Sequence, residues 1–329
     1  MKTDQIKNEC CRDEVARDRR GFLQGGLAAL AGLWLLGEPG LGSLLKIDWR
    51  NAQAEETATA PDATEPTGLA KAVRFNTSIQ KPFLNEKLAF DITFAGAKTA
   101  SGLITFKQTD NNEYTASVEG TISGLVGAMT PFQKVVMTSV MHPIKTKAGE
   151  RFVTKTFYRK TIRTSGTTES RHEFDYLRRK WTYTRVKDGK RDKGPVNRKI
   201  KEGVYYDDFV NILYNFRAQA YGAVKPGLKM TLNTMPWDRS LKINGKNVKK
   251  TATVVDVFVP ADGQMSEKDR AWLKEVGGDL LVIVTLDPDV YEIKSGQAKL
   301  AGVRNGLTPR GAWIEDALLF GDVKAKYKG

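Results

Sequence analysis

Apolar and polar side chains alternate with a period of two along most of the chain from Pro82 onwards. Within residues 87–94, the apolar side chains Leu88, Phe90, Ile92 and Phe94 occupy every second position. This spacing is typical of β-strands with one buried face. Similar runs follow at residues 103–106, 114–122, 133–141, 151–163, 168–176, 180–187, 228–237, 241–243, 248–259, 280–286, 298–303 and 311–326. Turn residues separate these short runs, so the sequence predicts a mainly β protein with a large curved antiparallel sheet or half-barrel meander.

One segment in the middle of the chain has helical periodicity instead. Its apolar side chains, three or four residues apart, are Phe209, Ile212, Leu213, Phe216 and Ala220. Asp207 and Asp208 precede them, and the macrodipole favours acidic residues at a helix N-terminus. We therefore expect one packed α-helix over about residues 207–221, with its apolar stripe against the sheet. A shorter polar helix, capped by Ser266, is expected at residues 266–275 on one of the connections.

The N-terminal segment has the features of an export signal. Arg19-Arg20 stand before Phe22-Leu23, and residues 21–37 carry no charge, which resembles a twin-arginine signal. Ala52-Gln53-Ala54 is a small-x-small cleavage site, so we expect cleavage after Ala54 and a periplasmic protein. The alternative is an inner-membrane anchor, since the uncharged run lies at the short end of the roughly 17–25 residues that span a bilayer.

The chain is expected to have three parts. Residues 1–54 form the twin-arginine-like signal segment. Residues 55–81 are rich in Thr, Ala, Pro and acidic side chains, which bury too little apolar surface to fold, so they predict a flexible linker. Residues 82–326 contain all of the expected strands, and their length suits a single β-rich envelope domain.

Few residues could support cysteine or histidine chemistry. Both cysteines, Cys10 and Cys11, precede the expected cleavage site, so we expect no disulfide, iron–sulfur cluster or cysteine–zinc site in the mature chain. The two histidines, His142 and His172, are too few for the usual zinc sites. The zinc-protease, nucleophile-elbow, phosphate-loop and dinucleotide motifs are missing from the sequence. We therefore expect no metal and no cofactor, and we assign no catalytic residue.

Positive charge is concentrated in one window of the chain. The formal net charge is +14, and residues 151–201 hold 17 Lys and Arg against 5 Asp and Glu. Residues 187–201 are expected to form a solvated loop at a hairpin tip. In the first strand of the window, an even number of positions separates Arg151, Lys155, Arg159 and Arg163 from one another. In a later strand, Arg179, Trp181, Tyr183 and Arg185 occupy every second position. Period two places each set on one face of the sheet.

If neighbouring strands align these faces, several arginines share one surface with aromatic rings. The candidate ligand-binding residues are Arg159, Arg163, Arg179, Trp181, Tyr183 and Arg185. Guanidinium groups bind carboxylate and phosphate, while the rings offer apolar contact. The alternative is an ordinary solvent face, which edge strands charge to resist aggregation. Because the protein is expected to be exported, its expected partner is an anionic envelope lipid or an acidic glycan and not nucleic acid, apart from transient contact with the export machinery.

Six short segments occur in an order that resembles that of a known family. They are residues 85–92, 97–102, 157–160, 172–176, 206–217 and 319–323. Together they resemble the exported bacterial proteins grouped as domain-of-unknown-function family 3108, and the likeness spans about residues 82–326, with a departure at residues 266–278. The resemblance implies a curved β-rich sheet in the cell envelope and offers no catalytic residues. By analogy, such sheets are similar to the half-barrels in which periplasmic lipoprotein carriers hold acyl chains.

Three functions are compatible with this sequence. The first is a non-enzymatic envelope protein that binds an anionic lipid or another acyl-bearing ligand in a β concavity with an Arg-rich rim. The alternative is a binder of acidic polysaccharide or cell-wall material through a basic sheet face. The second alternative is a glycan hydrolase with paired carboxylates, such as Glu173 with Asp175 or Glu315 with Asp316. Arg171 beside the first pair favours charge pairing over catalysis.

Overall fold

The computed structural model describes residues 79–94, 96–110, 112–123, 132–146, 149–243, 246–288, 295–315 and 322–329. The predicted export segment and nearly all of the predicted linker lie outside these ranges. The first group of strands comprises β1 (Glu86–Phe94), β2 (Ala97–Asp110), β3 (Glu113–Ile122), β4 (Phe132–Thr146), β5 (Gly149–Arg163), β6 (Gly166–Asp175), β7 (Lys180–Lys187) and β8 (Lys190–Lys199). The second group comprises β9 (Lys229–Ile243), β10 (Lys246–Phe258), β11 (Leu280–Thr285), β12 (Gln297–Val303), β13 (Thr308–Ile314) and β14 (Val323–Tyr327).

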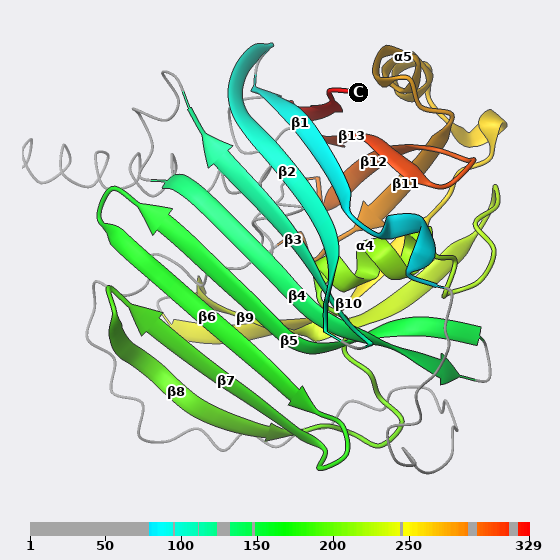
Figure 1. Ribbon diagram of the computed structural model, residues 1–329. Coiled ribbons are helices and arrows are strands. Elements are labelled where there is room, and N and C mark those ends of the chain that lie inside the picture. Colours follow the sequence, from blue (N-terminus) through cyan, green and yellow to red (C-terminus); the bar gives the residue numbers. More distant parts are fainter. Residues whose placement is uncertain are drawn as a thin grey trace, which may run out of the picture.

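All fourteen of these strands belong to one antiparallel sheet (Figure 1). Strands that follow one another along the chain are neighbours within each group, and β1 pairs with β14 to join the two groups, with Ile92 opposite Ala325. The edges of the sheet are β8 and β9. The prediction of a mainly β protein with a large antiparallel meander is therefore confirmed.

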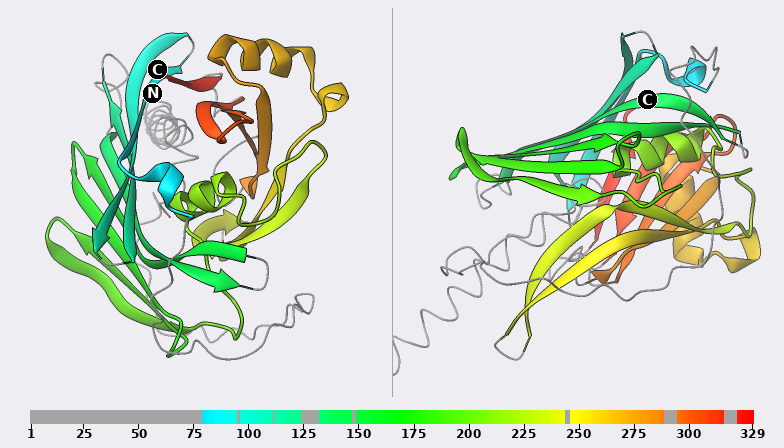
Figure 2. Two further views of the ribbon diagram at one scale, coloured as in Figure 1. Left: turned by 45° about the vertical axis from the view of Figure 1, so that its right-hand side comes forward. Right: turned by 90° about the horizontal axis from the view of Figure 1, so that it is seen from below.

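The sheet is curved, and its concave face holds the larger apolar core. Figure 2 shows the strands β4–β8 and β9–β12 as two diverging walls, with the helix α4 (Phe209–Arg217) between them. Along β1, Leu88, Phe90 and Ile92 are buried in this core, as their alternation predicts. Strand twist and several register shifts, such as the one between Ile92 and Thr93, bend the sheet around the core.

The helix α4 lies within the predicted range of residues 207–221, and it buries a polar stripe in addition to the predicted apolar one. Asp208 is its N-cap, and its carboxylate accepts hydrogen bonds from two backbone N–H groups of the first turn. The buried residues of the helix are Val210, Asn211, Tyr214, Asn215 and Arg217, whereas Phe209, Ile212, Leu213 and Phe216 are partly buried against the core. The predicted packing of the apolar stripe is therefore confirmed, and a polar stripe that was not predicted is buried more deeply beside it.

A second helix, α5 (Glu267–Val276), covers the convex face of β11–β13. Ser266 caps it, as predicted, and Gly277 ends it in the left-handed conformation with φ 69°. Trp272, Leu273 and Val276 form a smaller apolar core with side chains of these strands. The expectation of one packed helix is thus incomplete, since α5 is packed as well. No helix in the described ranges is long and apolar enough to cross a membrane.

The charged window contains two departures from the predicted strands. Val140 of β4 lies opposite Thr156, and Met141 lies opposite Thr154, so Lys155 is an extra residue in a bulge of β5. The bulge reverses the parity, and Arg151 therefore does not share the face of Arg159. The second departure is the predicted loop at residues 187–201, most of which forms the edge strand β8.

Candidate functional site

The concave face holds an apolar cavity of about 80 Å³, partly open to solvent, between α4 and the two walls of the sheet. Its lining includes Phe90, Ile104, Met137, Leu213, Phe216 and Leu280. Among the described residues that line it, only Glu119 and Arg217 carry charge. An engineered apolar cavity of roughly 150 Å³ stays dry and takes up benzene. A space of the present size and lining therefore suits a short stretch of hydrocarbon.

Two glycines help to keep this cavity open. Gly102 of β2 and Gly120 of β3 lie opposite each other, and the next neighbours across the sheet are Phe90 and Val135. All four residues line the cavity. A Cβ atom on Gly120 would meet no heavy atom within 4 Å. The missing side chain at residue 120 is therefore part of the open space.

One residue of the cavity lining, Arg217, belongs to a buried ion pair. The two terminal nitrogens of Arg217 donate to the two carboxylate oxygens of Glu86, each at 2.6 Å, and its Nε donates to the carbonyl oxygen of Leu307. Tyr214 donates from its hydroxyl to the same carboxylate, and the guanidinium lies over the ring of Phe83. These contacts join α4 to β1 and to the turn between β12 and β13.

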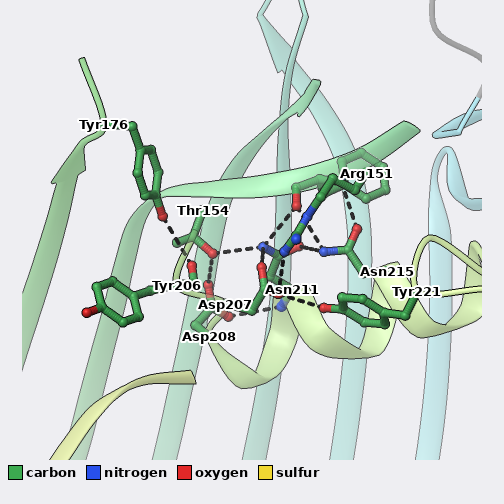
Figure 3. A network of polar contacts seen from close by, with 10 residues as sticks. Arg151, Thr154, Tyr176, Tyr206, Asp207, Asp208, Asn211, Asn215 and Tyr221 are labelled. Carbon is green, nitrogen blue, oxygen red and sulfur yellow. Dashed lines mark hydrogen bonds and ion pairs between the residues drawn. The ribbon is translucent and has the colours of Figure 1, made fainter. Parts of the chain in front are cut away.

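The N-terminus of α4 is held by buried carboxylates (Figure 3). Oδ1 of Asp208 accepts from the backbone N–H groups of Val210 and Asn211. Oδ2 of Asp208 accepts from the hydroxyls of Ser139 on β4 and Thr154 on β5, at 2.6 and 2.8 Å. Burial raises the pKa of Asp208 to about 6, although its hydrogen-bond donors act in the opposite direction.

The neighbouring Asp207 connects β5 to the edge strand β9. Its carboxylate pairs with Arg151 of β5 and accepts from the hydroxyl of Tyr221 at 2.7 Å. Its backbone N–H donates to the carbonyl of Asn233, and its own carbonyl accepts from the N–H of Met235. Burial raises the pKa of Asp207, and Arg151 opposes that rise. One residue thus links both walls of the sheet to the start of α4.

Asn211 and Asn215, one helical turn apart, satisfy the backbone of β5. Asn215 accepts from the N–H of Phe152 and donates to its carbonyl, and Asn211 donates to the same carbonyl. Phe152 lies opposite Pro143, which has no N–H, and β6 pairs with β5 only from Thr156 onwards. The two amide side chains therefore replace a missing strand, because buried backbone groups need partners.

We call this polar network the α4 clamp. It comprises Ser139, Arg151, Thr154, Asp207, Asp208, Asn211, Asn215 and Tyr221. Every carboxylate oxygen of Asp207 and Asp208 accepts from a donor within the protein. With its acceptors occupied in this way, the clamp has the character of a structural network that fixes α4 beside the cavity.

Five of the six candidate residues share one sheet face. Arg159 of β5 lies opposite Ser170 of β6, which lies opposite Arg185 of β7. Tyr183 and Trp181 lie two and four residues before Arg185, and Arg163 lies four residues after Arg159, so all five have the same parity. Arg179 does not belong to this face, because it lies in the turn before β7 with φ 53° and pairs with Glu202 at 2.6 Å.

The face with the arginines is continuous with the cavity, but its candidate residues do not line it. Arg159 lies directly opposite Met137 of β4, which is a lining residue. Arg159 itself is 5% exposed, and Arg185 pairs with Asp192 at 3.1 Å. Trp181 is buried and donates from its indole nitrogen to His172. The arginines therefore lie beside the apolar space and at a distance from its centre.

Three of the four carboxylates considered for glycan hydrolysis take part in ion pairs, and Asp316 lies outside the described residues. Glu173 pairs with Arg171 at 2.8 Å. Glu315 pairs with Lys268 at 3.1 Å and with Lys299 at 3.3 Å. Within the described residues, no group of three His, Cys, Asp or Glu side chains could hold a metal ion. The predicted charge pairing of Glu173 is confirmed.

Sequence analysis missed both the Glu86–Arg217 pair and the α4 clamp. Asp208, Asn211 and Asn215 do recur at spacings of three and four residues. A polar stripe beside an apolar one is also the ordinary pattern of a surface helix, so this spacing alone does not indicate the clamp. No local pattern marks Glu86 as the partner of Arg217, because 131 residues separate them.

Comparisons with known proteins give one distant structural match. No family model matches the chain, and no curated protein sequence matches it. The chain is similar to a crystal structure described as a beta-barrel-like protein of domain of unknown function DUF1849 from Brucella abortus. The two share 11% identity with a TM-score of 0.37, and the match covers 74% of this chain and 96% of that chain. The resemblance to family 3108 therefore stays a prediction.

Proposed function

We propose that the protein is a non-enzymatic envelope protein that holds an anionic, acyl-bearing ligand. The hydrocarbon tail enters the cavity beside α4, and the charged head lies toward Arg159 and Arg185. The cavity is the observation that supports this proposal most directly, because its described lining is almost entirely apolar. Burial of hydrocarbon contributes roughly 25 cal/mol per Å² of apolar surface, so the tail supplies most of the affinity.

The register of the sheet supports the position of the head group. Met137 lines the cavity, and Arg159, Ser170 and Arg185 follow it in one row across the next three strands. Neighbouring strands lie roughly 4.8 Å apart, so a ligand can reach from apolar lining to guanidinium groups within a short distance. Arg217 is less suited to the head, because Glu86 and Leu307 already occupy its donors.

The proposal includes the cellular location of the protein. The twin-arginine-like segment at residues 1–54 and the resemblance to family 3108 both favour an exported protein that acts in the periplasm. The partner would then be a lipid or lipid-linked molecule of the envelope.

Filling the cavity is expected to abolish binding of an acyl ligand. In the Gly120→Leu variant, the new side chain would occupy the open space beside Phe90 and Val135, since a Cβ there meets no neighbour. We expect affinity for the fluorescent fatty acid cis-parinaric acid to fall at least about tenfold, which corresponds to loss of two buried methylene groups. Fluorescence titration of the full chain measures this affinity.

The matched control is Gly263→Leu. Gly263 is exposed, has an unstrained φ and has no neighbour within 4 Å of a Cβ, but it does not line the cavity. This variant should bind cis-parinaric acid like the wild type. Equal affinities for the wild type and Gly120→Leu would contradict the proposal, and so would wild-type protein that binds no acyl probe. Binding of a soluble acidic glycan in place of the probe would favour the polysaccharide alternative.

A further inference from the structure

The turn between β6 and β7 presents an exposed leucine among basic side chains. Leu177 is 72% exposed, which is more than any other large apolar side chain whose exposure the structure describes. Arg178, Arg179 and Lys180 follow it directly in the sequence. We call this surface the basic tip, and it comprises Leu177, Arg178, Arg179, Lys180, Lys199 and Lys201.

Only part of the positive charge at the basic tip is neutralised by acidic neighbours. Asp175 lies 3.6 Å from Arg178, and Glu202 lies 2.6 Å from Arg179. Both acidic side chains are themselves at least one third exposed. Five basic residues against two acidic ones leave an excess of positive charge at the end of the hairpin.

The three lysines of the tip have no acidic partner within the described part of the chain. Lys180 and Lys199 occupy directly opposed positions on β7 and β8, and both are exposed. Like charges in such positions destabilise a strand pair. Lys201 is exposed as well and follows Ile200, whose N–H binds the carbonyl of Arg179. An anionic surface beside the hairpin would relieve this repulsion.

We propose that the basic tip docks on an anionic phospholipid bilayer. Leu177 enters the boundary between head groups and acyl chains, and the arginines and lysines lie near the lipid phosphates. A basic side chain close to such a surface raises membrane affinity about fivefold. An acidic polysaccharide would attract the charges but would offer Leu177 no apolar environment, so the exposed leucine favours a bilayer. The proposal does not depend on the cavity or on its ligand.

The test compares the full chain and its variants on vesicles of phosphatidylglycerol mixed with phosphatidylcholine and on vesicles of phosphatidylcholine alone. Co-sedimentation should show wild-type binding to the anionic vesicles that weakens with salt. Leu177→Gln should lower the affinity roughly tenfold, because the apolar contact is lost. The double variant Arg178→Gln/Lys180→Gln should lower it roughly thirty-fold.

The matched control removes two basic residues from the opposite end of the hairpin of β7 and β8. Lys190 and Arg191 begin β8, about 25 Å from Leu177 along an eight-residue strand. This distance exceeds the Debye length, so Lys190→Gln/Arg191→Gln should bind like the wild type. Hydrogen exchange should also slow at residues 176–180 on anionic vesicles and stay unchanged at residues 187–190.

Several results would overturn the proposal. One is equal binding of the wild type to both vesicle types, with no slowing of hydrogen exchange at residues 176–180. Equal losses for the two charge variants, with no effect of Leu177→Gln, would indicate nonspecific basic attraction. Another is slower hydrogen exchange at residues 176–180 in the presence of alginate, to the same extent in the wild type and in Leu177→Gln. That result would identify the tip as a glycan site.

Discussion

Replacement of Arg217 by Met is expected to lower the free energy of unfolding by about 3–5 kcal/mol, the cost of leaving one partner of a buried ion pair alone. The arginine side chain is 3% exposed and that of Glu86 is 13% exposed. The change removes both hydrogen bonds to Glu86 and the bond to the carbonyl of Leu307, so the carboxylate keeps only the hydroxyl of Tyr214. Urea unfolding of the full chain, followed by circular dichroism, measures the loss.

Two further variants make this expectation specific. The double variant Glu86→Leu/Arg217→Met should recover most of the lost stability, because an apolar pair needs no charge compensation. Arg171→Met breaks the pair with Glu173, in which both side chains are at least half exposed, and should cost less than about 1 kcal/mol. A cost for Arg217→Met as small as that for Arg171→Met would show that this pair does not support the cavity wall.

Between pH 4 and pH 7, the wild type is expected to lose roughly 2 kcal/mol of stability relative to an Asp208→Asn variant. Burial raises the pKa of Asp208 from 3.8 to about 6, so the folded state binds this proton more tightly than the unfolded state. The stabilisation is complete below the unfolded pKa. It declines as the pH rises and is lost above the folded pKa. Asparagine has no such proton, and its amide fits because the hydroxyls of Ser139 and Thr154 can donate or accept.

The measurement is a series of urea unfolding curves for both proteins at several pH values from 4 to 7. Asp91→Asn is the control, because hydrogen bonds from Lys98 and Lys328 lower the pKa of this exposed carboxylate. Its difference from the wild type should stay nearly constant over this range, because a carboxylate with a lowered pKa loses its contribution only at more acidic pH. Parallel stability curves for the wild type and Asp208→Asn would mean that the α4 clamp holds Asp208 without a raised pKa.

The alternation of side chains was sufficient to predict the class of fold and most of the strands. It failed where one extra residue changes the parity. Lys155 is exposed between the buried Thr154 and the half-buried Thr156. All three side chains are polar, so nothing in the local sequence distinguishes a bulge in β5 from continuous pairing. It also failed at β8, where Gly194, Pro195 and many charges suggest a loop. An edge strand tolerates proline, because its N–H side can face away from the sheet.

The helix and the packing of its apolar stripe were predictable, whereas the deeper burial of its polar stripe was not. The apolar residues Leu213 and Phe216 do line the cavity, but Asn211 and Asn215 are buried more deeply. Their burial depends on Pro143 and on the point at which β6 leaves β5, and both belong to the tertiary structure. The shared face of the arginines was predicted from period two, and its distance from the centre of the cavity was not.

The pairing of β1 with β14 has a consequence for how the chain acquires its structure. Thr93 and Lys324 lie side by side although 231 residues separate them, whereas nearly every other strand pair joins neighbours in the sequence. Each group of strands can assemble from local hairpins during synthesis, but the seam between the groups closes only after β14 has left the ribosome. Until then β1 presents a bare edge, which makes incomplete chains prone to aggregation and the final step slow.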